Sequence, residues 1–272
     1  MMLNETYTLS NGVKIPKLGL GTWFIDDDKA GDVVKEAVKL GYRLIDTAQA
    51  YGNERGVGEG VRNCGLPRNE IFVTTKLWND DVRSGNTREA LKKSLENLGL
   101  DYVDLYLIHW PAEGYVEAYL EMEKLQKEGL TRSIGVSNFR KSHLQNLLSK
   151  VHIVPSINQI ETNPQMVDEE TIQYCKENKI GVEAWSPLGS GACLNNPKIQ
   201  EIANKYQKSS AQIILRWLLQ KGIVILPKSV HENRIKENID LFNFVLENED
   251  VELINQLNQH KRTGPDPDNF DF

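Results

Sequence analysis

Short apolar segments alternate with segments of helical period along most of this chain, and this alternation restricts its possible folds more than any other feature. The apolar segments have the length of strands, and the segments between them repeat their apolar residues every three or four positions. The strand candidates are residues 18–20, 43–45, 71–75, 102–108, 131–136, 156–160, 181–184 and 223–226. The helix candidates include residues 29–40, 87–98, 116–127, 141–148, 168–178, 211–219 and 232–238. Strands that are joined through helices predict a parallel sheet.

The residues that follow each strand decide between two parallel folds. An open doubly wound sheet uses one crevice, whereas a barrel enzyme places its chemistry at the carboxyl ends of many strands. Nearly every predicted strand here ends in a polar or aromatic group: Asp46, Lys76, His109, Ser137 and Asn138, Gln159, Trp185 and Ser186, and Lys228 and Ser229. This ring predicts an α/β fold, a (β/α)8 TIM barrel, with residues 1–272 forming a single domain.

A second, smaller element precedes the barrel. Residues 6–9 and 13–15 resemble short strands, and the dipeptide Asn11-Gly12 between them tolerates the positive φ angles of a tight turn. We therefore expect a short N-terminal β-hairpin.

Composition limits the partners of the protein. The net charge of −6 comes from interspersed acids and bases, which argues against a nucleic-acid partner. The sequence shows no targeting signal and no apolar run that could span a bilayer, so we expect no membrane partner. The cysteines Cys64, Cys175 and Cys193 are odd in number and form no CxxC pair, which favours a reducing, cytoplasmic location. Nothing in the sequence demands more than a monomer.

Four of the polar residues have a shared chemical logic. A phenol has a reference pKa of about 10, so Tyr51 needs help to act as an acid near neutral pH. The ammonium group of Lys76 would favour the phenolate and lower the pKa of Tyr51, while Asp46 would balance the buried lysine charge. His109 could orient a carbonyl oxygen. Such a site protonates oxygen while a cofactor delivers hydride to carbon.

Other motifs are weaker. Gly56, Gly58 and Gly60 do not directly follow a strand, so we expect them to serve helix packing rather than dinucleotide binding. The five histidines lack metal-ligand spacing, and we expect no metal site. No serine lies in a GxSxG motif, which disfavours a serine nucleophile.

The motifs together resemble those of the aldo-keto reductase family, particularly its short, prokaryotic-type diketogluconate, methylglyoxal and aldehyde reductases. The matching stretches, in chain order, are GLGTW at 19–23, DTAQAYGNE at 46–54, TTKLW at 74–78, DLYLIHWP at 104–111, IGVSNF at 134–139, NQIE at 158–161, AWSPLG at 184–189 and LPKSVHENRIKEN at 226–238. They cover almost the whole chain, including the tail RTGPDPDNFDF. The resemblance implies an NADPH-dependent reductase of aldehydes, ketones or dicarbonyls.

The resemblance also implies residue roles. Tyr51 would be the general acid, tuned by Lys76 and Asp46, and His109 would orient the carbonyl. Ser137, Asn138 and Gln159 would hold the nicotinamide carboxamide, and Trp185 would stack on the ring where many members have Tyr. The remaining expected cofactor contacts are Gly21, Thr22 and Trp23, then Ser186, Leu188 and Gly189 beside the pyrophosphate, and Lys228, Ser229, Val230, Arg234, Glu237 and Asn238 towards the adenosine end.

Lys228 and Arg234 would favour the 2′-phosphate of NADPH over NADH. His231, where the family often has a small hydroxyl or amide residue, leaves the strength of that preference open.

The substrate pocket would be walled by Trp23, Trp78, Trp110 and His109. The segment after His109 is short and little chain follows the last helix, so we expect an open, tolerant pocket. Two other functions remain open at this point: a nicotinamide-binding redox sensor with little catalysis, and a phosphosugar isomerase or lyase with Lys228 and Ser229 at its phosphate site.

Overall fold

Eight parallel strands form the centre of the molecule in the computed structural model, which describes residues 5–272. They are β3 (Leu20–Gly21), β4 (Leu44–Asp46), β5 (Phe72–Leu77), β6 (Val103–Ile108), β7 (Thr131–Ser137), β8 (Ile157–Glu161), β9 (Gly181–Trp185) and β10 (Val224–Ile225). Each strand pairs with the next along the chain, and a parallel bridge between Leu18 and Ile225 closes the ring. The predicted (β/α)8 barrel is confirmed, and all eight strands lie where the sequence predicted them.

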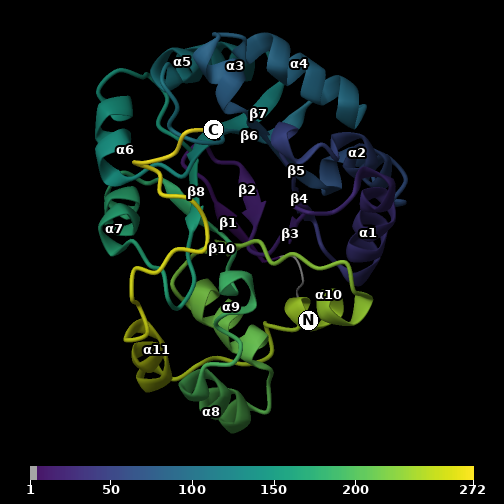
Figure 1. The fold of residues 1–272 in the computed structure, drawn as a ribbon. Coiled ribbons are helices and arrows are strands. Elements are labelled where there is room, and N and C mark those ends of the chain that lie inside the picture. The colour runs from purple at the N-terminus through teal and green to yellow at the C-terminus, as the bar shows by residue number, and fades with distance from the viewer. Residues whose placement is uncertain (1–4) are drawn as a thin grey trace.

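Helices surround this barrel (Figure 1). They are α1 (Asp27–Leu40), α2 (Glu54–Arg62), α3 (Asn79–Arg83), α4 (Thr87–Leu98), α5 (Tyr115–Lys127), α6 (Lys141–Leu148), α7 (Glu169–Glu177), α8 (Pro197–Tyr206), α9 (Ser210–Gln220), α10 (Glu232–Ile239) and α11 (Asn248–Asn255). In α1 the buried residues Ala30, Val34, Ala37 and Val38 recur at helical spacing and belong to the hydrophobic core. None of the helices within residues 5–272 is long and apolar enough to cross a bilayer.

Sequence patterns missed α2, whose glycines interrupt the apolar period. A Cβ on Gly56 would lie 2.0 Å from the carbonyl oxygen of Asp27, and one on Gly58 would lie 2.0 Å from that of Leu98. A Cβ on Gly60 would lie 2.8 Å from the carbonyl oxygen of Gly31. The three glycines therefore let α2 press against α1 and α4, as expected.

The predicted hairpin is also confirmed, as β1 (Thr6–Thr8) and β2 (Lys14–Pro16), with Gly12 at φ +85° in the turn. Leu9 and Ile15 of this segment are buried in a cluster with inward-facing residues of the barrel, namely Leu44, Phe72, Leu105, Leu107, Ile157, Val224 and Leu226. One end of the barrel is thereby filled with apolar side chains. The polar residues occupy the other end, at the carboxyl ends of the strands.

The segment after α11, residues 256–272, crosses this polar end. In Figure 1 it runs in yellow from α11 to the C label, which stands beside the labels of β6 and β7. The Arg140 guanidinium holds it by ion pairs to Asp266, at 2.8 Å, and to Asp268. The tail is therefore part of the barrel mouth.

Candidate functional site at the barrel mouth

Four side chains converge at the polar end of the barrel. Asp46 is the last residue of β4, Lys76 lies in β5, and His109 directly follows β6. Tyr51 ends the short 3-10 helix η1 (Gln49–Tyr51), which follows β4 and brings the phenol back over Lys76. The structure thus places together the four residues that the sequence suggested for catalysis.

The Lys76 ammonium group is the centre of this cluster. Its Nζ donates to Asp46 Oδ2 at 2.7 Å, to the Thr47 carbonyl oxygen at 2.9 Å and to the Tyr51 hydroxyl oxygen at 3.2 Å. Lys76 is wholly buried and Asp46 is 4% exposed. An ammonium group with three oxygen acceptors uses all three of its hydrogens, so its position is fixed.

The surroundings set the protonation of this pair. Burial by itself lowers the pKa of Lys76, but Asp46 and Tyr51 outweigh it, so the pKa of Lys76 lies above its ordinary value and the lysine stays charged. Burial raises the pKa of Tyr51, and the positive charge of Lys76 opposes this without cancelling it. Lys76 thus lowers the pKa of Tyr51 as the sequence suggested, but burial is the larger effect, and the pKa lies above its ordinary value. Tyr51 carries its proton at neutral pH.

His109 completes the cluster. Its ring meets the Tyr51 ring edge-on at a centroid distance of 5.7 Å. Burial, assisted by the charge of Lys76, holds the pKa of His109 well below its usual range, so the imidazole is neutral. Its buried Nδ1 has no hydrogen-bond partner among residues 5–272. A neutral imidazole keeps one N–H donor that can serve a carbonyl oxygen.

The residues expected at the nicotinamide lie beside this cluster and bond to one another. The Ser137 hydroxyl donates to the Gln159 carbonyl oxygen at 2.9 Å, and Asn138 Nδ2 donates to the His109 carbonyl oxygen at 3.0 Å. The indole Nε1 of Trp185 donates to Asn138 Oδ1 at 2.8 Å. Gln159 Nε2 donates to Asp46 Oδ1 at 2.8 Å and so joins these residues to the four-residue cluster. Asn138 adopts φ +62°, which turns the chain sharply at the end of β7.

The loop after β9 carries the residues expected at the pyrophosphate. Ser186 has φ +48°, and its hydroxyl oxygen accepts from the Ser190 amide at 3.1 Å. Leu188 is half-buried and Gly189 is buried, with φ +59°. The Thr263 hydroxyl lies 3.4 Å from that of Ser186, so the tail contacts this loop.

The expected adenosine-end residues lie after β10 and on α10. Lys228 and Arg234 are exposed, and within residues 5–272 neither forms an ion pair. Ser229 is buried, and its hydroxyl oxygen accepts from the His231 amide at 3.1 Å. Val230 is 42% exposed and Asn238 is buried.

Glu237 makes a different kind of contact. Its carboxylate accepts from the Ser209 hydroxyl and links α10 to α9.

Three further expected contacts lie at the end of β3 and directly after it. Gly21 lies against the segment that follows β10, because a Cβ there would be 3.6 Å from Cβ of Lys228. Thr22 is wholly buried and its hydroxyl donates to the Asp46 carbonyl oxygen at 2.9 Å. Trp23 is 51% exposed and contacts the neighbouring Phe24 ring. Trp23 therefore stands at the rim rather than in the buried part of the site.

Trp78 and Trp110 form an aromatic wall beside His109. The Trp78 ring meets the His109 ring edge-on at 5.2 Å and stacks on the Phe272 ring with centroids 5.7 Å apart. Trp110 contacts both Phe270 and Phe272, at 5.3 and 5.2 Å. The expectation that too little chain follows the last helix to cover the pocket is wrong, because the tail supplies two of the four rings.

Sequence reasoning missed several residues of this region. The pattern of the tail gave no sign that Phe270 and Phe272 would fold back to the mouth. Glu161, at the end of β8, accepts from the Thr263 amide at 2.7 Å and so secures the tail. Glu183, in β9, accepts from Gln159 Nε2 at 2.7 Å. Glu161 lies two residues after Gln159 in β8, and Glu183 lies two residues before Trp185 in β9. Because every second residue of a strand points to the same face, the positions of Gln159 and Trp185 could have indicated both glutamates.

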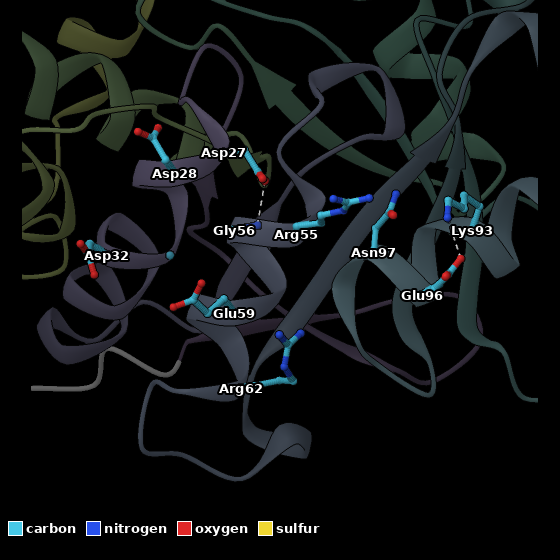
Figure 2. A pocket seen from close by; sticks show the side chains of 11 residues that line it. Asp27, Asp28, Asp32, Arg55, Gly56, Glu59, Arg62, Lys93, Glu96 and Asn97 are labelled. Carbon is cyan, nitrogen blue, oxygen red and sulfur yellow. Dashed lines mark hydrogen bonds and ion pairs between the residues drawn. The ribbon is translucent and has the colours of Figure 1, made fainter.

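A separate cavity of about 570 Å³ lies on the outside of the barrel between α1, α2 and α4 (Figure 2). Charged and polar side chains line it, including Asp28, Asp32, Arg55 and Glu59. Its lining contains no aromatic ring and none of the four clustered residues. It offers no means of carbonyl reduction, which leaves the mouth as the candidate site. In the part of the chain that the structure describes, no three histidine, cysteine or acidic side chains are grouped so as to hold a metal ion.

Comparisons with known proteins agree with this geometry. Residues 17–259 match the family model described as aldo/keto reductase family. The chain is 48% identical to glyoxal reductase of Bacillus subtilis and 46% identical to methylglyoxal reductase DkgA of Escherichia coli, and each alignment covers 99% of both proteins. A solved structure of a Bombyx mori aldo-keto reductase in complex with NADP superposes with a TM-score of 0.91 at 39% identity, covering 98% of this chain and 97% of that one.

Proposed function

This chain belongs to the aldo/keto reductase family and is an oxidoreductase acting on carbonyl groups, and on that premise we propose that it reduces small aldehydes and dicarbonyls of the glyoxal and methylglyoxal kind with NADPH. One observation carries the proposal above all others: Lys76 Nζ bonds both Asp46 and the Tyr51 hydroxyl, next to a neutral His109. This arrangement favours a reductase over the alternative of a phosphosugar isomerase or lyase.

The mouth residues fit a nicotinamide dinucleotide phosphate. Ser137, Asn138 and Gln159 offer hydroxyl and amide groups for the carboxamide, and the half-buried Trp185 offers a ring face. Lys228 and Arg234 are exposed cations that suit a phosphate monoester. When bound, NADPH supplies the hydride that adds to the carbonyl carbon.

The residues of the chain then handle the proton. Tyr51 donates its hydroxyl proton to the carbonyl oxygen, and the charge of Lys76 stabilises the phenolate that forms. Asp46 holds Lys76 in place through the 2.7 Å contact. The neutral His109 donates its ring N–H to the same carbonyl oxygen and so aims it at Tyr51.

The aromatic wall favours small substrates. Trp78 and Phe272 lie on one side of His109, and Trp110 packs against Phe272. A compact dicarbonyl needs little room between these rings, and its second carbonyl makes the first more electrophilic. The glyoxal and methylglyoxal reductases among the relatives support this choice.

The decisive experiment is NADPH oxidation by the wild type and by Tyr51→Phe against a panel of carbonyls, with NADH alongside. We expect turnover of methylglyoxal by the wild type and a loss of at least about 100-fold in kcat for the variant, the usual contribution of a general acid. NADPH binding should be unchanged. An unchanged rate in the variant would remove the role of Tyr51, and a wild type inactive towards every carbonyl would favour the redox-sensor alternative.

We also propose that residues 1–272 act as a single-domain monomer in the cytoplasm. The monomer is checked by light scattering coupled to size-exclusion chromatography. Cell fractionation checks the location.

A further inference from the structure

One buried carboxyl group at the site has no part in the reaction just described. Glu183 lies in β9, wholly buried, opposite Gln159 of β8 in the parallel register. Its Oε2 accepts from Gln159 Nε2 at 2.7 Å, while its Oε1 has no partner within residues 5–272. A carboxyl group is costly to bury without a cationic partner, so its presence calls for a reason.

The bonds of Gln159 supply that reason. A side-chain amide nitrogen carries two hydrogens, and Gln159 Nε2 donates them to Asp46 Oδ1 and Glu183 Oε2. The reverse orientation would lose the bond to Asp46 and set the amide oxygen against the negative Asp46 carboxylate. Asp46 and Glu183 together therefore fix the amide and leave its oxygen as the free acceptor.

The charges around Glu183 show why it does not disturb the catalytic cluster. Asp46, Lys76 and Tyr51 are the ionisable groups that face it across the barrel; β8 contributes the neutral Gln159, and β10 contributes Val224 and Ile225. Burial, reinforced by the negative charge of Asp46, raises the pKa of Glu183 to about 8. Near neutral pH Glu183 is mostly uncharged, and Lys76 stays available to Asp46 and Tyr51.

We propose that Glu183 is a positioning residue for the reductase: it holds the Gln159 amide so that the amide oxygen accepts from the carboxamide NH2 of the bound nicotinamide. This inference rests on the proposed function, because it needs the nicotinamide beside Gln159. Without Glu183 the amide is free to turn, the nicotinamide loses an acceptor, and the ring is less well aligned for hydride transfer.

Two variants separate this role from simple packing. In Glu183→Gln the new side-chain oxygen can accept the same hydrogen bond but cannot ionise. In Glu183→Leu the acceptor is lost while the volume stays similar. Thr74→Val is a matched control, since Thr74 is another wholly buried residue at this level of the barrel, opposite Asp46, and its hydroxyl has no partner in the described part of the chain.

The measurements are the Kd of NADPH, from quenching of protein fluorescence, and kcat for methylglyoxal between pH 6 and 9.5. We expect Glu183→Leu to raise the Kd and lower kcat about 10-fold each, the scale of a lost buried hydrogen-bond partner. Glu183→Gln and Thr74→Val should match the wild type at pH 7. The kcat of the wild type should fall with rising pH as Glu183 ionises, because the negative charge of Glu183 raises the pKa of Tyr51. The pH profile of Glu183→Gln should lack this fall.

The outcomes keep the two proposals apart. A Glu183→Leu variant that binds NADPH and turns over like the wild type overturns the role of Glu183 and leaves the reductase proposal intact. If Glu183→Leu does not fold, Glu183→Gln decides the matter. A pH profile like that of the wild type, together with a 10-fold weaker affinity of Glu183→Gln for NADPH, overturns the role of Glu183. Should the wild type reduce no carbonyl, NADPH affinity alone still decides the role of Glu183.

Discussion

The ring of Phe272 lies almost parallel to the indole of Trp78, with centroids 5.7 Å apart and planes 8° apart. The backbone oxygen of Phe272 accepts from Asn79 Nδ2 at 3.0 Å and from Arg83 at 2.8 Å, so the ring is held in place from behind. The Trp78 ring also meets the His109 ring edge-on, with centroids 5.2 Å apart. Phe272 lies 193 positions after Asn79 in the chain and yet forms part of the aromatic wall beside His109.

Replacing Phe272 should change substrate binding more than chemistry. In Phe272→Ala the aromatic wall loses one ring, and we expect KM for methylglyoxal to rise about 3- to 10-fold with kcat within twofold, because the lost contact is made equally in ground and transition states. Steady-state kinetics test this. Val245→Ala, at a residue 62% exposed and outside the mouth, is the control. A fall in kcat with unchanged KM would contradict a wall role.

Breaking the buried ion pair should cost stability as well as activity. Lys76→Met leaves Asp46 buried without its cation, and we expect a loss of about 3–5 kcal/mol in the free energy of unfolding. Denaturant unfolding of the variant measures this. The double variant Asp46→Asn/Lys76→Met should recover most of the loss, since no unpaired charge remains, yet stay inactive. Equal destabilisation in both variants would argue against the pairing explanation.

The two exposed cations should set the cofactor preference. We expect Lys228→Ala and Arg234→Ala to raise the Kd of NADPH about 10-fold each and to leave the Kd of NADH nearly unchanged, because only NADPH carries the extra phosphate. Titrations at several salt concentrations should show a smaller salt dependence in each variant. Lys236→Ala, which lies on α10 with Arg234, should behave like the wild type. Equal losses for both cofactors would place these cations elsewhere on the dinucleotide.

Glu183 should make stability depend on pH in a defined direction. Its pKa is raised by burial from 4.5 to about 8 in the folded protein, so between these values the folded state holds a proton that the unfolded state has released. The stability from this group is complete below pH 4.5 and is lost as pH rises towards 8. The Tm of Glu183→Gln minus the Tm of the wild type should therefore increase as the pH rises from 5 to 8.5. A constant Tm difference over this range would mean that Glu183 does not titrate there.

The barrel and the clustering of four polar side chains at its mouth could be predicted because both depend on local patterns. Apolar runs marked the strands, and the residue after each run marked the mouth, which is how Asp46, Lys76 and His109 emerged. Helix α2 escaped because Gly56 and Gly58 replace the apolar residues that mark a helix face, and their purpose appears only when α1 and α4 lie against them. The arrangement of residues 1–272 as a single domain stays a prediction.

The net pKa of Tyr51 could not be predicted, because it is a difference between two opposing effects. The sequence suggested the charge of Lys76, but burial is a property of the folded mouth, and it is the larger effect. The role of the tail was hidden for a related reason. Phe270 and Phe272 reach Trp110 in a tail that Arg140 and Glu161 bind, and these residues are far apart in the sequence.

The hairpin and the apolar cluster around Leu9 and Ile15 close the barrel beneath the catalytic residues. The apolar side chains of this end offer no groups that carry a proton, so we expect a proton given up by Tyr51 to be replaced from the mouth. Substrate, product and the replacement proton would then all use the same end of the barrel, because the other end is filled with apolar side chains.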